Sequence, residues 1–202
     1  MTRRLVQLYA GLVLYGASMA LMIRAGLGLD PWDVLHQGLA DRLPLSFGIV
    51  TIVVGALVLL AWIPLRQRPG IGTVSNVIVI GLAVDATLAV LPAPDVLAMR
   101  VVFVFAGVGL NGVATAAYIG ARLGPGPRDG LMTGLVRRTG RSVRMVRTSI
   151  EVTVLAVGWL LGGTVGVGTV LYALGIGPLV HVLLPAMTVP ELASEAVVSL
   201  RR

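Results

Sequence analysis

Six long apolar stretches constrain this 202-residue chain more than any other feature of its sequence. A helix needs roughly 20 apolar residues to cross the hydrocarbon core of a bilayer, and each stretch reaches or approaches that length. The composition agrees, because 56% of the residues are hydrophobic and only 12% are charged. We therefore expect an all-α integral membrane protein. The expected spans cover residues 5–23, 48–64, 72–91, 101–121, 148–163 and 167–185.

The arginines favour one orientation of these spans. All 16 basic residues are Arg, and with the N-terminus in the cytoplasm 13 of them lie on the cytoplasmic side. Arg24, Arg42 and Arg100 lie on the other side. The positive-inside rule thus predicts that both termini lie in the cytoplasm. Because the arginines lie in short loops between apolar runs, their excess is a topology signal, and we expect no nucleic-acid partner.

The densest group of arginines lies between residues 137 and 147. We expect it to set topology and to attract anionic lipid headgroups, each charge contributing about 1 kcal/mol near the surface. A funnel for an anionic substrate is the alternative. Glu151 follows Arg147 by four residues, a spacing that predicts an ion pair on one helix face.

The sequence repeats itself at an offset of 96 residues. Residues 16–81 align without gaps on 112–177 with 23 identities in 66 positions, where a chain of this composition would give about six by chance. We divide the chain into repeats 1–96 and 97–189 and a short cytoplasmic tail, 190–202. Each repeat holds three spans, so the second enters the membrane from the opposite side. This predicts an inverted-topology repeat, an arrangement that many transporters use.

The best-matched part of the first repeat has the signals of a broken helix. Gly28 suits the end of the preceding span, Asp30 is a good N-cap and Pro31 suits the first helical position. Asp33, at the third helical position, is placed to accept hydrogen bonds from free backbone N–H groups. We expect a short helix over residues 31–43, too short to span a bilayer.

The second repeat carries the same signals at Gly124, Gly126, Pro127 and Asp129. Each short helix has two alternatives. It could lie in the headgroup plane as a capped interfacial helix, or it could re-enter the bilayer. Two re-entrant helices would approach the midplane from opposite faces and form a ligand site lined by helix termini.

The motifs Gly-Leu-Gly-Leu-Asp-Pro-Trp-Asp at residues 26–33 and Gly-Pro-Gly-Pro-Arg-Asp at 124–129 identify a resemblance. The chain resembles the YczE/YyaS branch of the YitT-related bacterial membrane proteins over nearly its whole length. That resemblance implies a multi-span inner-membrane protein whose biochemical role is undefined.

Several polar residues fall within the expected spans. Asp85 and His181 are equivalent in the two repeats, and we weigh a proton-linked relay against separate local hydrogen bonds. Asn111 either links helices or contacts a substrate. His36, on the first short helix, is expected to be solvated. The Gly-rich segment 162–168 is expected to form a tight turn.

We expect a small secondary transporter or channel-like carrier of a small molecule or ion; the alternative is a non-transporting membrane scaffold that acts through helix–helix partners. We expect no enzyme, cofactor or metal site, since no nucleophile–base pair, P-loop or metal-ligand cluster stands out. A homo-oligomer is left open. The tail, from residue 189, is expected to be an amphipathic helix or a frayed end. The candidate pathway residues are Gly28, Pro31, Asp33, Asp85, Asn111, Gly124, Pro127, Asp129 and His181.

Overall fold

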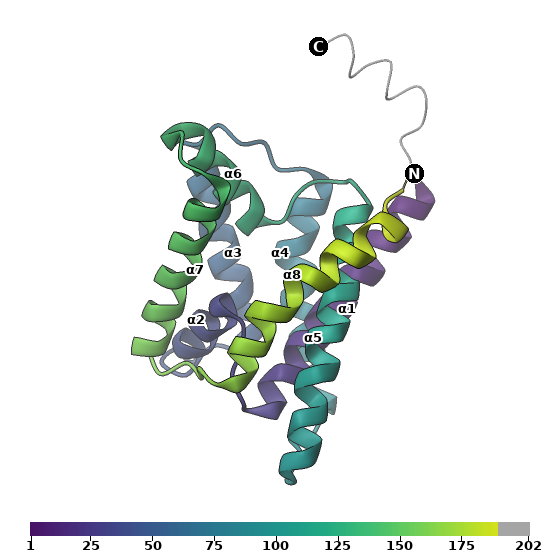
Figure 1. The fold of residues 1–202 in the computed structure, drawn as a ribbon, viewed down its shortest axis with the longest axis vertical. Coiled ribbons are helices and arrows are strands. Elements are labelled where there is room, and N and C mark those ends of the chain that lie inside the picture. The colour runs from purple at the N-terminus through teal and green to yellow at the C-terminus, as the bar shows by residue number, and fades with distance from the viewer. Residues whose placement is uncertain (190–202) are drawn as a thin grey trace.

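A computed structural model describes residues 1–189, and every regular element in that part of the chain is an α-helix (Figure 1). The helices are α1 (Thr2–Ala25), α2 (Pro31–Ala40), α3 (Phe47–Trp62), α4 (Ile71–Val90), α5 (Leu97–Gly120), α6 (Pro127–Thr139), α7 (Val143–Leu160) and α8 (Val167–Met187). The expected all-α fold is confirmed. The tail over residues 190–202, with the helix expected there, lies outside the described residues.

All six apolar stretches form helices, but they differ in how well they fit a bilayer. Four helices, α1, α4, α5 and α8, are long and apolar enough to cross a membrane. Helix α3 is apolar but has 16 residues. Helix α7 has 18 residues and carries three charged side chains, Arg144, Arg147 and Glu151.

Helix α1 packs mainly on α5 and α4. Small residues permit this close packing. A Cβ atom on Gly11 would lie 2.9 Å from the backbone nitrogen of Tyr118 on α5, and one on Gly16 would lie 2.7 Å from the nitrogen of Val84 on α4. Such small-residue contacts are typical of helix pairs in membranes, where backbones must approach to gain packing energy.

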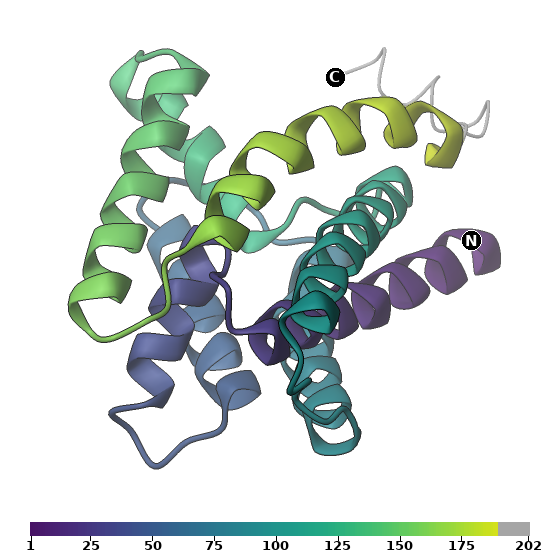
Figure 2. The ribbon, with the colours of Figure 1, turned by 60° about the horizontal axis from the view of Figure 1, so that its bottom comes forward.

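The two short helices lie toward opposite ends of the molecule. Figure 1 shows α2 in the lower half and α6 in the upper half, with α3 and α7 running between them. Helix α2 packs against α7, and α6 packs against α3. The view in Figure 2 shows α8 lying alongside α5, its main partner.

Two backbone hydrogen bonds join the halves of the chain reciprocally. The Gly168 N–H donates to the Leu27 carbonyl over 2.8 Å, and the Gly72 N–H donates to the Leu123 carbonyl, also over 2.8 Å. The two donors, Gly72 and Gly168, are 96 residues apart, and so are the two acceptors, Leu27 and Leu123. Each half therefore presents the same loop carbonyl to the same helix start in the other half.

Glycine is required at the loops that make these contacts. Gly28 has φ 116°, and an added Cβ would lie 2.6 Å from the backbone nitrogen of Gly166. Gly124 has φ 128°, and its Cβ would lie 2.8 Å from the Thr73 Oγ1. A side chain at either position meets both backbone strain and a steric clash.

The expectation that Gly28 and Gly124 end the preceding helices is wrong. Helix α1 ends at Ala25 and is capped by Gly26, which takes the left-handed conformation with φ 63°. Helix α5 ends at Gly120, and Arg122, the residue equivalent to Gly26, has φ 55°. Gly28 and Gly124 lie three and four residues beyond the ends of α1 and α5, where each contacts the other half, and the motif alone does not reveal this.

Helices α2 and α6 begin where predicted, but the Asp33 carboxylate, expected to accept from free backbone N–H groups, contacts His36 and the Arg128 guanidinium. The Asp30 carboxylate accepts hydrogen bonds from the Trp32 and Asp33 backbone N–H groups, at 2.8 and 3.0 Å, and Pro31 occupies the first turn. Helix α6 begins at Pro127 after Gly126. Helix α2 ends at Ala40, about one turn earlier than predicted.

The Gly-rich segment forms the predicted turn between α7 and α8. Gly162 has φ 104°. The Thr164 N–H donates to the Gln37 side-chain oxygen at 2.7 Å, and the Thr164 carbonyl accepts from the Leu29 N–H at 3.2 Å. These bonds attach the turn to α2 and to the loop before it.

Candidate functional site

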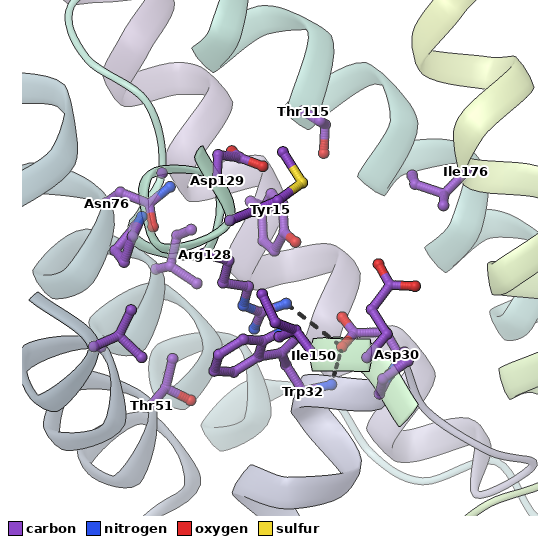
Figure 3. A pocket seen from close by; sticks show the side chains of 18 of the residues that line it. Tyr15, Asp30, Trp32, Thr51, Asn76, Thr115, Arg128, Asp129, Ile150 and Ile176 are labelled. Atoms are coloured by element: carbon purple, nitrogen blue, oxygen red, sulfur yellow. Dashed lines mark hydrogen bonds and ion pairs between the residues drawn. The ribbon is translucent and has the colours of Figure 1, made fainter. Parts of the chain in front are cut away.

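A cavity of about 320 Å³ lies between the first turns of α2 and α6 (Figure 3). Each of the helices α1 to α8 contributes residues to its wall. A volume of this size suits a small molecule, and convergent polar groups within an otherwise apolar wall are typical of a ligand site.

The cavity lies between the repeats in a symmetrical way. Most of its lining residues form pairs 96 positions apart. Such pairs include Pro31 with Pro127, Trp32 with Arg128, His36 with Met132, Thr51 with Arg147, Asn76 with Tyr172, and Ile80 with Ile176. Both halves of the chain therefore present the same positions to one space, often with different side chains.

Arg128 joins the two short helices. Its guanidinium lies 3.6 Å from Asp30 Oδ1 and 3.7 Å from Asp33 Oδ1, and 4.9 Å from the ring centre of Trp32. Both carboxylates are 2% exposed. A buried carboxylate is costly unless it is paired, so this arginine offsets much of the cost of placing two acidic groups at the start of α2. Figure 3 shows Arg128 reaching from α6 to Asp30.

The expectation that His36 is solvated is wrong. The ring is 1% exposed, and its Nδ1 lies 3.1 Å from Asp33 Oδ1 and 3.5 Å from the Thr51 hydroxyl. Phe47 packs edge-to-face against the ring. The sequence places His36 on a short helix outside the expected spans. In the structure this helix packs against α7 and α3, and His36 is buried at the cavity wall.

Asp129, equivalent to Asp33, lies on the other side of the cavity. Its carboxylate accepts a hydrogen bond from the Tyr118 hydroxyl at 3.2 Å and lies beside the Gly126 backbone. On α7, Arg147 donates to Glu151 at 2.9 Å, and the predicted ion pair is confirmed. Both members of that pair line the cavity.

Asn111 links three helices, as one of its two interpretations predicted. Its amide donates to the Ser18 hydroxyl on α1 at 2.9 Å, and its oxygen accepts from the Tyr172 hydroxyl on α8 at 3.2 Å. Asn111 itself does not line the cavity, whereas Tyr172 does. The asparagine thus positions one wall of the cavity.

Asp85 and His181 lie away from the cavity. Asp85 accepts hydrogen bonds from the Ser46 hydroxyl and, at 2.8 Å, from the Gly48 N–H, and so holds the start of α3. His181 is exposed on α8. The structure therefore favours a local bonding role for Asp85.

The sequence motifs do not single out Arg128 as a site residue, because it lies in a segment whose arginines are expected on the cytoplasmic side. The repeat alignment holds the signal that could have found it. Arg128 aligns with Trp32, in the best-matched part of the two repeats. The residue that it aligns with belongs to the expected short helix and not to a loop. No group of three or more potential metal-ligating residues occurs within the part of the chain that the structure describes.

Long apolar helices around a cavity lined by apolar and polar side chains define the class of this molecule: it is a helical membrane protein. Residues 2–185 match a family model described as "Family of unknown function (DUF6198)". The chain belongs to that family.

Three relatives are similar over most of their length. An uncharacterized protein of Haemophilus influenzae is 42% identical over 173 residues, which cover 86% of this chain and 79% of the relative. The uncharacterized membrane protein YczE of Bacillus subtilis is 35% identical over 179 residues, or 88% and 83% of the two chains. The uncharacterized protein YyaS of the same organism is 25% identical over 179 residues, or 87% and 89%. The resemblance to the YczE/YyaS branch is thus confirmed. No solved structure matches the chain.

Proposed function

We propose that the protein is a small secondary transporter or channel-like carrier, with the cavity between α2 and α6 as its substrate site. The observation that carries the proposal is the charged cluster of Asp30, Asp33 and Arg128, buried among apolar helices beside an open volume. Ionisable groups in such surroundings are costly, and in membrane proteins they commonly mark the path of a substrate or ion.

The proposal includes six spans and an inverted repeat. Three observations support the inversion: the offset of 96 residues in the sequence, the reciprocal hydrogen bonds at Leu27 and Leu123, and the placement of α2 and α6 toward opposite ends of the molecule (Figure 1). In this arrangement both termini are cytoplasmic, and the membrane is the bacterial inner membrane.

The short helices act as re-entrant half-helices in this proposal. Burial of Asp33 and His36 supports this alternative, because a helix in the headgroup plane would leave its polar face to water. The N-terminal turns of both helices reach the cavity, which gives the broken backbone the protein and polar surroundings that it needs inside a bilayer.

A transport assay without a chosen substrate tests the proposal. Proteoliposomes holding the purified protein are incubated with a small-molecule extract of bacterial cells, and their contents are compared by mass spectrometry with those of empty liposomes. We expect at least one solute to accumulate. Asp33→Asn and Asp129→Asn should reduce its uptake, whereas Asp95→Asn, a change in an exposed loop, should not.

Two outcomes contradict the proposal. One is the absence of any accumulating solute with wild-type protein that is folded and inserted. The other is uptake that both aspartate variants leave unchanged. A partner that stays bound through purification, together with the first outcome, would favour the membrane scaffold instead.

A further inference from the structure

We infer that the cavity binds a small organic cation, an amine with an apolar body, and that Asp129 is the carboxylate that holds its charged nitrogen. This inference rests on the proposed function, because it names the substrate class of the proposed carrier site. It is carried by the charges, helix ends and aromatic groups of the cavity wall.

The charges around the cavity leave a negative excess. Arg147 is paired with Glu151 at 2.9 Å, which accounts for one charge of each sign. Arg128 is shared between Asp30 and Asp33, so that cluster keeps one negative charge when both carboxylates are ionised. A further acidic residue, Asp129, is left over.

Asp129 is the carboxylate free to receive a ligand. It accepts a hydrogen bond from Tyr118 and forms no ion pair with any residue among those described. It lines the cavity directly, and Figure 3 shows it across the cavity from Asp30. Arg128 and Arg147 line the same cavity, but both are paired with other carboxylates, so a cation that enters the cavity would give the largely buried Asp129 carboxylate a direct partner.

The helix ends do not offer an anion site. Free N–H groups at a helix start can bind an anion, but at α2 two of them already donate to the Asp30 carboxylate. At α6 the carboxylate of Asp129 lies beside the Gly126 backbone. Each short helix thus supplies its own anion, and a second one would meet repulsion from these carboxylates.

The aromatic groups in the wall also suit a cation. Tyr15, Tyr118, Tyr172 and Trp32 all line the cavity. The face of an aromatic ring attracts cations, most strongly for Trp. Arg128 over Trp32, at 4.9 Å, shows that this wall already holds one positive group in that way. Aliphatic side chains, among them Val54, Ile150 and Ile176, also line the cavity and would contact an apolar body.

Binding to the purified full-length protein in nanodiscs, measured by isothermal titration calorimetry, tests the inference. The probes are benzylamine, benzyl alcohol and benzoate, which share a ring and differ in charge. We expect benzylamine to bind at least ~10-fold more tightly than either of the others. Asp129→Asn should weaken benzylamine binding by ~10-fold or more, and Asp41→Asn, at an exposed position beyond the cavity, should leave it unchanged.

Benzoate binding as tight as benzylamine binding, no benzylamine binding, or an Asp129→Asn variant that binds benzylamine as the wild type does would each overturn the inference. The probe comparison uses the wild-type protein, so it stands even if the variant does not fold. Uptake of a neutral or anionic solute without benzylamine binding would refute the substrate class and leave the carrier standing. Selective benzylamine binding without uptake of any solute would refute the carrier and leave the cation site standing.

Discussion

Helices α2 and α6 begin with the same residues at equivalent positions but differ in the side chains between them. Pro31 and Pro127 begin them, and Asp33 and Asp129 follow at the same distance. Between these matched residues, α2 carries Trp32 where α6 carries an arginine, and the two side chains meet at the cavity. The positions that fix the backbone are alike, whereas those that face the cavity have diverged. The two helices thereby place an aromatic side chain and a basic side chain at equivalent positions of one asymmetric site.

The packing behind the two helices shows the same divergence. Behind α6, the Trp62 ring fills the space that the missing side chain of Gly130 leaves. At the equivalent place in the other half, Gly158 allows α7 to lie against the backbone of Val34. Trp62 and Gly158 are equivalent, and so are Gly130 and Val34. Each contact thus pairs a glycine with a larger residue, and the glycine lies on opposite partners in the two halves.

The largest expected effect comes from breaking the contacts that Gly28 and Gly124 make with the other half of the chain. Gly28→Val and Gly124→Val each place a side chain against the other half at a positive φ, so we expect neither variant to yield monodisperse protein on size-exclusion chromatography. Gly26→Asn is the matched control. Gly26 also has a positive φ, but an added Cβ would meet nothing within 4 Å. Normal yields of either valine variant would show that the reciprocal contact is dispensable.

The next effect removes the bridge between the halves. Arg128→Gln leaves Asp30 and Asp33 buried without their cation, so we expect a loss of about 3 kcal/mol in stability, seen as a lower melting temperature in detergent. Adding Asp30→Asn and Asp33→Asn to this variant should recover part of the loss. An Arg128→Gln protein as stable as the wild type would contradict the pairing.

A smaller effect tests the exchanged packing. Gly130→Val should clash with the Trp62 ring and destabilise the protein by about 1–3 kcal/mol. Combining it with Trp62→Gly recreates the residue types found at Val34 and Gly158. The double-mutant cycle, followed by thermal unfolding, should therefore show a favourable coupling of at least ~0.5 kcal/mol. Additive losses would mean that the two contacts are not equivalent.

The smallest effect makes α2 resemble α6 at one position. His36→Met gives α2 the residue that α6 carries there, Met132, and removes the contact with Asp33. We expect a loss of about 1 kcal/mol, because one buried hydrogen bond goes while packing volume is largely kept. The melting temperature provides the test, and a loss as large as that of Arg128→Gln would show that His36 is the principal partner of Asp33.

The sequence predicts the fold of this protein better than its site. Apolar runs and the cap at Asp30 locate the helices, because these signals act between neighbouring residues. The contacts of Asn111 and the Arg147–Glu151 pair were also foreseen, one as a helix link and one from helix spacing. Arg128 and His36 were misjudged because their surroundings come from helices far apart in the chain, and no local pattern shows that a polar helix will be covered.

The central claim, that two inverted repeats enclose the cavity, can be tested by labelling introduced cysteines. The chain has no cysteine, so each variant carries a single thiol. Asp41→Cys and Arg137→Cys occupy equivalent, exposed positions near the ends of α2 and α6. With a membrane-impermeant maleimide, we expect Asp41→Cys to label from outside intact spheroplasts and Arg137→Cys to label only in inside-out vesicles. Labelling of both from the same side would contradict the inversion.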